Sequence, residues 1–505
     1  MASTFFGLTI AYSGLQAANT SLTITGHNVS NINTKGYTRQ QAGTQAADAL
    51  RTHTTYGAIG SGVVVTEISQ IRDSYYDVKY RNNMANYGQY SVKESYMGQI
   101  EDYLDEFTLN GYSQEYKNFF SAVNQLTITP GDTSAKNQLI NNAKSLADYF
   151  NTLTTNLRNV QADANNEIKD AVQQINSYAK NIAALNRQIN QIEANYGNAN
   201  DLRDKRNAMI DELSEIVNLE TSEEDMGNNV SNFSVRINGQ TLVSSYSYNT
   251  LETVARTDKK NYSDAEGLYD VQWNSGQKFD MYSTSLSGHL KGLIDIRDGN
   301  NGEHENIETD DDGNNVTDSD GNLVLTTAPA ADKTVSYKGV PYYQAQLNEF
   351  AKIFSDAVNK IMKSGYTSDG SSKGISLFVT QPNTTVMSAG NITVNPELLK
   401  NADLLAIKKE QNDGESDAKI MEELNKLQSE KIFAGGTGSY FLESIVSDMS
   451  IDSQKAVNLY KNYTDLKTSI HNQRLSIMGV DTDEEAMDMI KYQQAYNLNS
   501  KMMSV

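Results

Sequence analysis

The chain has 505 residues, too many for one hydrophobic core, and its formal net charge of −21 argues against nucleic acid or an anionic membrane as a partner. It has no cysteine, which excludes disulfides and thiol chemistry, and having only 5 prolines favours long uninterrupted helices. No stretch reaches the roughly 18 apolar residues of a membrane span, and the first residues lack the basic segment of a cleaved signal peptide.

A heptad pattern over residues 4 to 34 predicts an amphipathic helix at the start of the chain. Its two rows share one helix face, as in the seam of a coiled coil. Because the second row is mostly small or polar, the helix is marginal alone, and we expect it to order against a neighbouring subunit. The first row is Leu8, Leu15, Leu22 and Val29, and the second is Ala11, Ala18, Thr25 and Ile32.

The segment "HNVSNINTKGYTRQ", residues 27 to 40, follows this helix and ends it in polar residues. Asparagine and glycine favour turns, and Gly36 can adopt the positive φ that β-branched residues avoid. The simplest interpretation is therefore a turn that leads the chain out of the helix.

Helical patterns dominate the next part of the chain. Residues 55 to 82 predict short strands that lead into a helix, and further helices follow to about residue 217. Two heptad runs, Leu139 to Val160 and Ile168 to Ile189, predict two long helices whose seams differ in phase, because eight residues separate them. We expect helices of this length to pack as an antiparallel bundle.

The pattern changes to strands near residue 226. "FSVRINGQTLV" alternates apolar residues and then turns at Asn238 and Gly239, which predicts a β-hairpin. "GLYDVQWN" is a second strand candidate, and the acidic residues 298 to 322 predict a surface loop or mobile excursion. A helix over residues 342 to 363 and short strands near residues 375 to 395 follow.

The C-terminal part is again helical, with heptad spacing from Leu459 onward. Thr482 and Glu485 form a capping-box pattern that predicts the start of a last helix, in which Met489, Tyr496 and Met503 share one face. Helices at both ends suggest that the termini pair with each other. The β-rich middle would then be an insertion at the far end of a rod.

Catalytic and metal-binding patterns are weak. The five histidines are scattered, and we find no nucleophile, phosphate-loop or dinucleotide motif, so the sequence predicts neither an enzyme nor a cofactor. Acidic residues at 310, 311, 312, 318 and 320 have the composition of a calcium loop. They lack the glycine required at its sixth position, which favours a solvated loop over a metal site.

Both ends of the chain resemble signatures of one family. After Ser13-Gly14-Leu15, the N-terminal segment matches the pattern ANNIxNxNTxGYxR, and "DTDEEAMDMIKYQQAY" matches LxxExxx(M/L)IxxQxAY. These patterns belong to the axial proteins of the bacterial flagellum, which form the rod, the hook and the hook–filament junction. The matching residues are Asn28, Asn31, Asn33, Thr34, Gly36, Tyr37 and Arg39 at one end, and Glu485, Met489, Ile490, Gln493, Ala495 and Tyr496 at the other.

One further element points to the hook-associated members of this family. "DLRDKRNAMIDELSEIVNLE", residues 201 to 220, is similar to the element that follows their long helices. His27 stands where the family usually has asparagine or a small residue. The family also usually continues by about one short helix beyond the point where this chain stops.

The resemblance and the patterns together predict an α+β, mainly helical fold, an elongated multi-domain rod. We expect a terminal coiled-coil domain (residues 1–50 and 472–505), a helical bundle (51–225 and 338–471) and a β-rich outer domain (226–337). The coiled-coil contacts would use Leu8, Leu15, Leu22 and Val29 from one end and Ile490, Tyr496 and Met503, or their neighbours, from the other end of an adjacent subunit.

The resemblance also implies a function. The chain would be exported to the extracellular flagellum without a cleaved signal, and would form a ring with copies of itself between hook and filament. Its implied partners are the hook protein, hook-associated protein 3 and a dedicated export chaperone. The alternatives are a hook or rod subunit, or a free coiled-coil scaffold or adhesin whose middle part binds a ligand.

Overall fold

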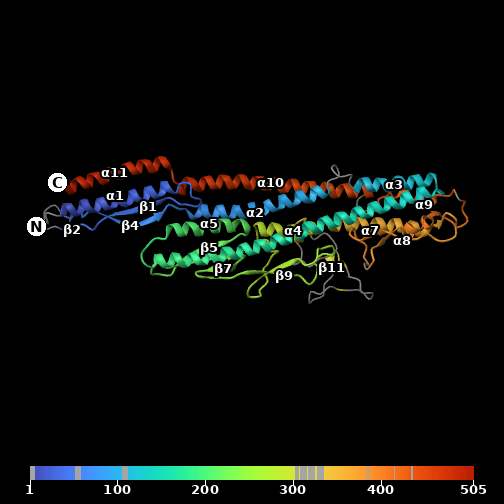
Figure 1. Ribbon diagram of the computed structural model, residues 1–505, viewed down its shortest axis with the longest axis horizontal. Helices are drawn as coiled ribbons and strands as arrows, with labels where there is room; N and C mark the ends of the chain where they lie inside the picture. The colour runs from blue at the N-terminus through green and yellow to red at the C-terminus, as the bar shows by residue number, and fades with distance from the viewer. Residues whose placement is uncertain are drawn as a thin grey trace.

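The computed structural model describes residues 6–51, 58–104, 112–301, 306–307, 316, 325–326, 335–382, 384, 386–414, 416–433 and 436–504. Over these residues the chain forms a long rod with both terminal helices at one end (Figure 1). The mainly helical α+β fold expected from the sequence is thereby confirmed. The helices are α1 (Phe6–Ser30), α2 (Ser74–Leu104), α3 (Tyr112–Ile128), α4 (Thr133–Glu193), α5 (Asn200–Ile216), α6 (His289–Asp298), α7 (Val340–Ser364), α8 (Pro396–Lys400), α9 (Lys419–Lys426), α10 (Gly438–Met478) and α11 (Thr482–Ser504), with a 3₁₀ turn, η1 (Ala402–Leu404).

The strands form small antiparallel sheets. One has four strands in the order β5-β6-β7-β8, and the others pair two strands each. The strands are β1 (Gln40–Ala46), β2 (Leu50–Arg51), β3 (Ala58–Ile59), β4 (Val63–Gln70), β5 (Glu220–Asp225), β6 (Ser231–Ile237), β7 (Gln240–Ser244), β8 (Ser247–Tyr248), β9 (Leu251–Ala255), β10 (Tyr269–Trp273), β11 (Asn306–Ile307), β12 (Leu325–Thr326), β13 (Tyr366–Thr367), β14 (Phe378–Thr380), β15 (Ile392–Val394) and β16 (Ala406–Lys408).

Helices α2, α4 and α10 run along the rod, with α2 antiparallel to the other two (Figure 1). Aromatic pairs join α2 to α10: the ring centroids of Tyr87 and Tyr460 lie 5.5 Å apart, and those of Tyr90 and Tyr463 lie 5.3 Å apart. Antiparallel packing of long helices is therefore present between α2 and α10, whereas the two predicted heptad helices form the single helix α4.

Helix α4 replaces two predicted helices with one. It runs without interruption for 61 residues, and Asp132 caps its start by accepting a hydrogen bond from the Ser134 backbone N–H. Ala164 is buried between Val160 and Ile168, so two steps of four residues cross the gap that suggested a change of phase. The prediction of two helices was wrong. The step of four residues from Val160 to Ala164, followed by another to Ile168, keeps the buried residues on one face of a continuous helix.

The core of the far half of the rod is rich in phenylalanine. On α7, Leu347, Phe350, Phe354 and Val358 are all buried, as the 342–363 pattern predicts. The ring of Phe350 stacks on that of Phe433 with centroids 5.0 Å apart. Aromatic packing of this kind joins α7 to the chain that follows α9.

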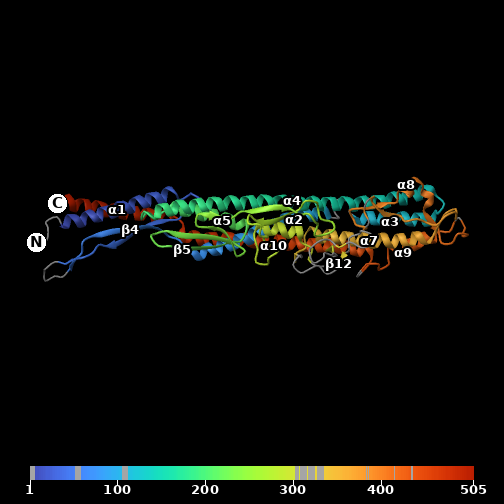
Figure 2. The same ribbon diagram turned by 90° about the horizontal axis from the view of Figure 1, so that it is seen from below.

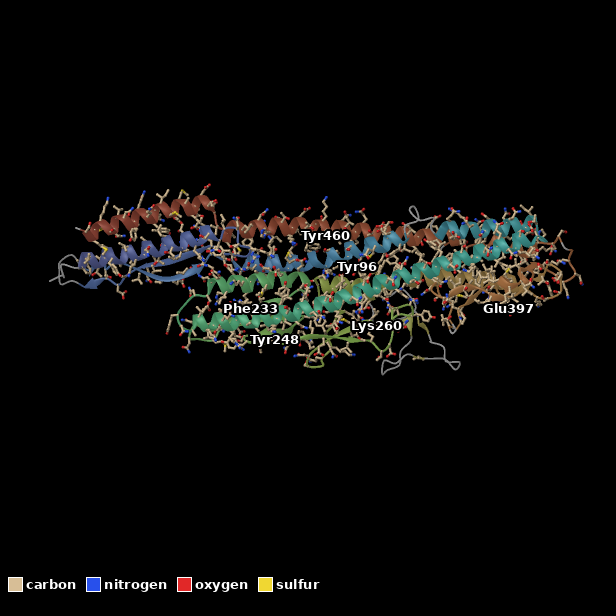
Figure 3. The ribbon with its side chains drawn as sticks, in the orientation of Figure 1. Tyr96, Phe233, Tyr248, Lys260, Glu397 and Tyr460 are labelled. Atoms are coloured by element: carbon tan, nitrogen blue, oxygen red, sulfur yellow. The ribbon has the colours of Figure 1, made fainter. Side chains whose placement is uncertain are left out.

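The predicted hairpin is present as β6 and β7. Asn238 and Gly239 have φ values of 50° and 75°, the pair of positive angles that a tight two-residue hairpin requires. Phe233, labelled in Figure 3, packs against the Arg206 guanidinium, whose central carbon lies 3.8 Å from the ring centroid. The second strand candidate is β10, which pairs with β9.

The sheet does not lie at the far end of the rod, so that expectation was wrong. The Asn186 and Asn190 side-chain amides on α4 donate to backbone carbonyls of Ser245 and Ser231 at 2.9 and 2.8 Å, which holds the sheet along the side of that helix. The far end instead contains the turn between α3 and α4, with α8 and α9 (Figure 2). Hydrogen bonds to α4 thus place the sheet beside the rod body.

The acidic segment begins differently from the prediction. Asp298 is the last residue of α6, not the start of a loop, and it is buried between Arg256 and Arg297. Burial acts to raise the pKa of Asp298, but the two guanidinium groups hold it well below its usual range. The candidate calcium ligands 310 to 312, 318 and 320 lie outside the described residues.

The two ends of the chain form the near end of the rod. Helices α1 and α11 lie side by side in both views, next to the β1–β4 ribbon (Figures 1 and 2). Helix α10 continues to Met478, so the break before α11 falls at Gly479, several residues after the expected domain boundary at 471/472. Over the described residues, none of the helices combines the length and apolar character needed to cross a membrane.

Candidate functional site

Helix α1 meets α11 of the same chain through small and polar side chains. Ala11, Ala18 and Thr25 of the second heptad row are buried. A Cβ atom added at Gly14 would lie 2.8 Å from the Asn499 side chain, which shows how closely the two helices approach. These three residues of the second row therefore lie within the intramolecular contact.

The leucine row lies at the edge of this contact. Leu8 is 39% exposed, whereas Leu15, Leu22 and Val29 are half-buried. The last residue of the second row, Ile32, is also exposed. This row is thus still partly available to another subunit, and its role in assembly stays a prediction.

On α11, the predicted assembly residues face mostly outward. Met489, Ile490 and Met503 are exposed, as is Gln493, while Ala495 and Tyr496 are half-buried. Three apolar side chains outside the motif are exposed as well. These are Met487, Leu498 and Met502, at 66%, 63% and 62%.

Asn28 is the centre of the N-terminal motif. Its side-chain amide donates to the Gln40 carbonyl at 2.9 Å and to the Glu485 carboxylate at 3.0 Å. Its side-chain oxygen accepts from the Tyr37 hydroxyl at 2.7 Å and from the Gln40 N–H at 3.0 Å. Asn28 is 2% exposed, so these bonds satisfy a buried polar group and join the motif to the other end of the chain.

Arg39 makes the second connection to α11. Its Nε donates to Glu485 at 2.7 Å, one terminal nitrogen donates to Glu484 at 2.9 Å, and the other lies 3.5 Å from Asp488. Burial acts to lower the pKa of Arg39, but the bonds to Glu485 and Glu484 raise it overall. Arg39 therefore stays charged and neutralises acidic side chains at the start of α11.

Glu485 does not close a capping box. Asp481, rather than Thr482, accepts hydrogen bonds from the backbone N–H groups of Asp483 and Glu484. Glu485, with 1% exposure, instead points its carboxylate toward Asn28 and Arg39. The predicted cap, Thr482, was therefore wrong by one residue. Asp481 caps the helix instead, because aspartate is as good a helix cap as threonine.

Tyr37 is held from two sides. It donates to Asn28, and its oxygen lies 2.9 Å from His27 Nδ1. Burial raises the pKa of Tyr37 well above its ordinary value, and the nearby carboxylates of Asp201 and Asp204 raise it further. The phenol is therefore a neutral hydrogen-bonding group.

The rest of the motif forms the turn that the sequence predicts. Gly36 has φ of +81°, and Thr34 donates through its hydroxyl to the Asn31 side chain at 3.2 Å. The Asn31 amide donates to the His27 carbonyl at 3.0 Å, and Asn33 is exposed.

A residue of α5 that we did not single out holds the motif against the rod. Asp204 accepts from the Thr38 N–H at 2.8 Å and from the Thr38 hydroxyl at 2.7 Å. Burial raises the pKa of Asp204, and the bonds from Thr38 oppose that rise. Asp204 belongs to "DLRDKRNAMIDELSEIVNLE", whose resemblance to the hook-associated element was the signal that could have identified it.

Ion pairs extend this contact toward α2 and α10. Arg72 binds Asp77 at 2.6 Å, and Asp77 also pairs with Arg474 of α10 at 2.8 Å. Arg474 binds Asp211 of α5 at 2.6 Å, which in turn pairs with Arg81 of α2 at 2.8 Å. The terminal motif is thus continuous with a partly buried polar network that joins three rod helices.

Hydrogen bonds and ion pairs between side chains make up this region. Where the structure describes the chain, no three His, Cys, Asp or Glu side chains are grouped so that they could hold a metal ion. A small polar cavity of about 20 Å³ between Ser21, Tyr492 and their neighbours has room for about one water molecule.

Two family models match parts of this chain. Residues 97–378 match the family model of the flagellar hook-associated protein FlgK helical domain, and residues 471–505 match that of the flagellar basal body rod FlgEFG protein C-terminal region. The chain is 27% identical over 529 residues to flagellar hook-associated protein 1 of Bacillus subtilis (strain 168), covering 100% of this chain and 97% of the relative.

Two further comparisons extend this likeness. The chain is 28% identical over 542 residues to flagellar hook-associated protein 1 of Salmonella typhimurium, covering 98% and 96% of the two chains. The solved structure of the flagellar hook junction protein FlgK from Burkholderia pseudomallei is similar in fold. Its TM-score is 0.61 at 14% identity, over 79% of this chain and 100% of that one.

Proposed function

Because this chain belongs to the family of flagellar hook-associated protein FlgK, we propose that it assembles with copies of itself at the hook–filament junction. As a member of that family it is a structural component of the bacterial flagellum. The observation that carries the assembly proposal is the terminal helix pair: α1 and α11 pack through small and polar side chains, while apolar side chains of α11 face outward. An exposed apolar face of this kind favours contact with another protein.

The partners follow from family membership and from this face. The family implies contact with the hook and other flagellar components. The finer proposal is a ring of identical subunits that contacts the hook protein below and hook-associated protein 3 above, supplied by a dedicated export chaperone. In this proposal the chain leaves the cell without a cleaved signal and has no enzymatic activity.

A hook or rod subunit is the second candidate, because residues 471–505 match a model shared with rod proteins. Deletion of the gene distinguishes the two. Loss of a junction protein leaves hooks without filaments and releases filament protein into the medium, whereas loss of a hook or rod subunit removes the hook itself. The match over residues 97–378 favours the junction. A free scaffold or adhesin would leave both hook and filament intact.

The apolar face can be tested directly. The double variant Ile490→Asp, Leu498→Asp places charges at positions that are 58% and 63% exposed, so the rod should keep its melting temperature. We expect electron microscopy to show that this variant no longer adds to purified hooks lacking the native junction protein, because a charge buried in an interface is costly. Ser500→Asp, at an exposed polar position on a different side of α11, is the matched control and should add normally. Normal addition by the double variant would overturn the proposal.

A further inference from the structure

One residue of the N-terminal motif spans the break between α10 and α11. Helix α10 ends at Met478 and α11 begins at Thr482. The Arg39 N–H donates to the Met478 carbonyl at 2.9 Å, while the Arg39 side chain binds Glu484 and Glu485 in the first turn of α11. We propose that Arg39 is a positioning residue that fixes the direction of the α1–α11 pair relative to the rod.

The break itself is a weak joint. Residues 479 to 481 are not helical, and the last carbonyls of any helix lack partners within it. The Arg39 N–H satisfies one of these carbonyls, and the Arg39 carbonyl accepts from the Ile71 N–H at 2.9 Å, at the end of the β1–β4 ribbon. The backbone of this residue is therefore fixed on the rod side of the joint.

The side chain of Arg39 is fixed on the other side. Its three guanidinium nitrogens face the three carboxylates of Glu484, Glu485 and Asp488. The Glu485 side chain is only 2% exposed, so its charge needs a close cation. A lysine has one compact ammonium group and cannot span these three carboxylates in the same way.

The α1 helix shares this fixed point. Asn28 donates to the same Glu485 oxygen that accepts from Arg39. The two terminal helices therefore meet the guanidinium group at one carboxylate, and a loss of Arg39 should weaken the attachment of both, while Thr38 keeps its bonds to Asp204. Large buried side chains of the rod, such as Phe350 and Phe354, lie in α7 in the far half of the rod, so the rod should keep its stability without Arg39.

The direction of α11 can be measured in the full-length monomer. The chain has no cysteine, so Lys461→Cys on α10 and Gln494→Cys on α11, both at exposed positions, give a unique spin-label pair. The labels lie at most about 50 Å apart along two helices, within reach of pulsed dipolar spectroscopy. We expect a narrow distance distribution in the parent and a broad one in Arg39→Gln, Arg39→Lys and Glu485→Gln.

The matched control removes a neighbouring charge of the same motif. Lys35 pairs with Glu212 of α5 at 2.7 Å and does not hold α11, so Lys35→Gln should keep the narrow distribution. All variants should keep the melting temperature of the rod. If Arg39 instead stabilised the whole rod, its replacement would lower that temperature. A distribution in Arg39→Gln as narrow as in the parent would overturn the proposal, as would equal broadening in Lys35→Gln.

The consequence for assembly rests on the function proposed above. A freed joint must be ordered again on assembly, and ordering one residue reduces affinity roughly tenfold, so Arg39→Gln should add to purified hooks about tenfold more weakly. If the parent chain does not add to hooks while the distance change persists, the proposed function fails and the positioning role stands. If Arg39→Gln broadens the distance distribution but adds to hooks as well as the parent does, the proposed consequence for assembly is wrong.

Discussion

At the scale of single residues, Asp204 shows how one carboxylate can secure a terminal segment. It receives two hydrogen bonds from Thr38, and Arg72 lies 3.4 Å from it. The residue is 5% exposed, so water cannot replace these bonds if the carboxylate is removed. The Asp204 side chain therefore provides much of the attachment of residues 36 to 40 to the rod.

We expect Asp204→Ala to lower the free energy of unfolding by about 3 kcal/mol, because it leaves the buried N–H and hydroxyl groups of Thr38 without their acceptor. Urea unfolding followed by circular dichroism measures this loss. Asp201→Ala is the control: that side chain is 60% exposed, and its loss should cost less than about 1 kcal/mol. If both variants lose the same free energy of unfolding, Asp204 contributes no more to stability than the exposed Asp201.

At the scale of elements, the β6–β7 hairpin depends on its turn. Asn238 and Gly239 both have positive φ, and no heavy atom near Gly239 restricts a side chain there. Backbone conformation alone therefore decides which residues this position accepts. Gly98, in α2, also has open space around it but lies in an ordinary helical conformation.

The two glycines should respond to alanine with opposite signs. Gly239→Ala should destabilise the chain by about 1 kcal/mol, because alanine resists positive φ. Gly98→Ala should stabilise it by roughly 0.5–1 kcal/mol, because alanine is the better helix former. Thermal unfolding measures the change in stability of each variant relative to the parent. A change in the same direction for both variants would contradict this explanation.

At the scale of the whole molecule, packing is uneven along the rod. Among the described side chains of α11 only Glu485 is buried, and α1 buries mainly alanine, serine and threonine, whereas α4 buries a long row of apolar side chains. Segments that bury little apolar surface open locally at lower cost than the rest. The near end of the rod should therefore be its least stable part.

Limited proteolysis of the monomer should show this difference. We expect early cuts near residues 48 and 479 that remove the two terminal helices and leave a resistant rod, identified by mass spectrometry. Early cuts in α4 or α7 would contradict the ranking. Ends that resist protease as long as the rod does would favour the free scaffold that we considered as an alternative.

Local patterns predicted much of the fold. The heptads of α4, the hairpin turn at Asn238 and Gly239 and the buried face of α7 all depend on neighbours in sequence, and all are present. The prediction of a break between Val160 and Ile168 was wrong because the sequence does not show whether the helix continues. Two separate helices and one helix whose buried residues are three or four apart give the same pattern of apolar residues. The assembly residues were predicted from periodicity and resemblance together, and their role stays a prediction.

The contacts of the terminal motif could not be predicted. Arg39 and Glu485 lie 446 positions apart, and one sequence carries no signal that pairs them. Several acidic residues near Glu485 were equally good candidates, and its spacing from Thr482 fitted a local cap. Only the packing of α1 on α11 decides which carboxylate becomes buried.

Helix α4 has a mechanical consequence. Its buried row runs from Leu139 to Glu193 in fifteen steps of three or four residues, a mean of 3.6 residues per step. That mean equals the natural period of an α-helix, whereas a strict heptad row would wind the helix into a left-handed supercoil. The helix can therefore stay straight over about 90 Å. We expect a straight helix of this length to stiffen the rod against bending.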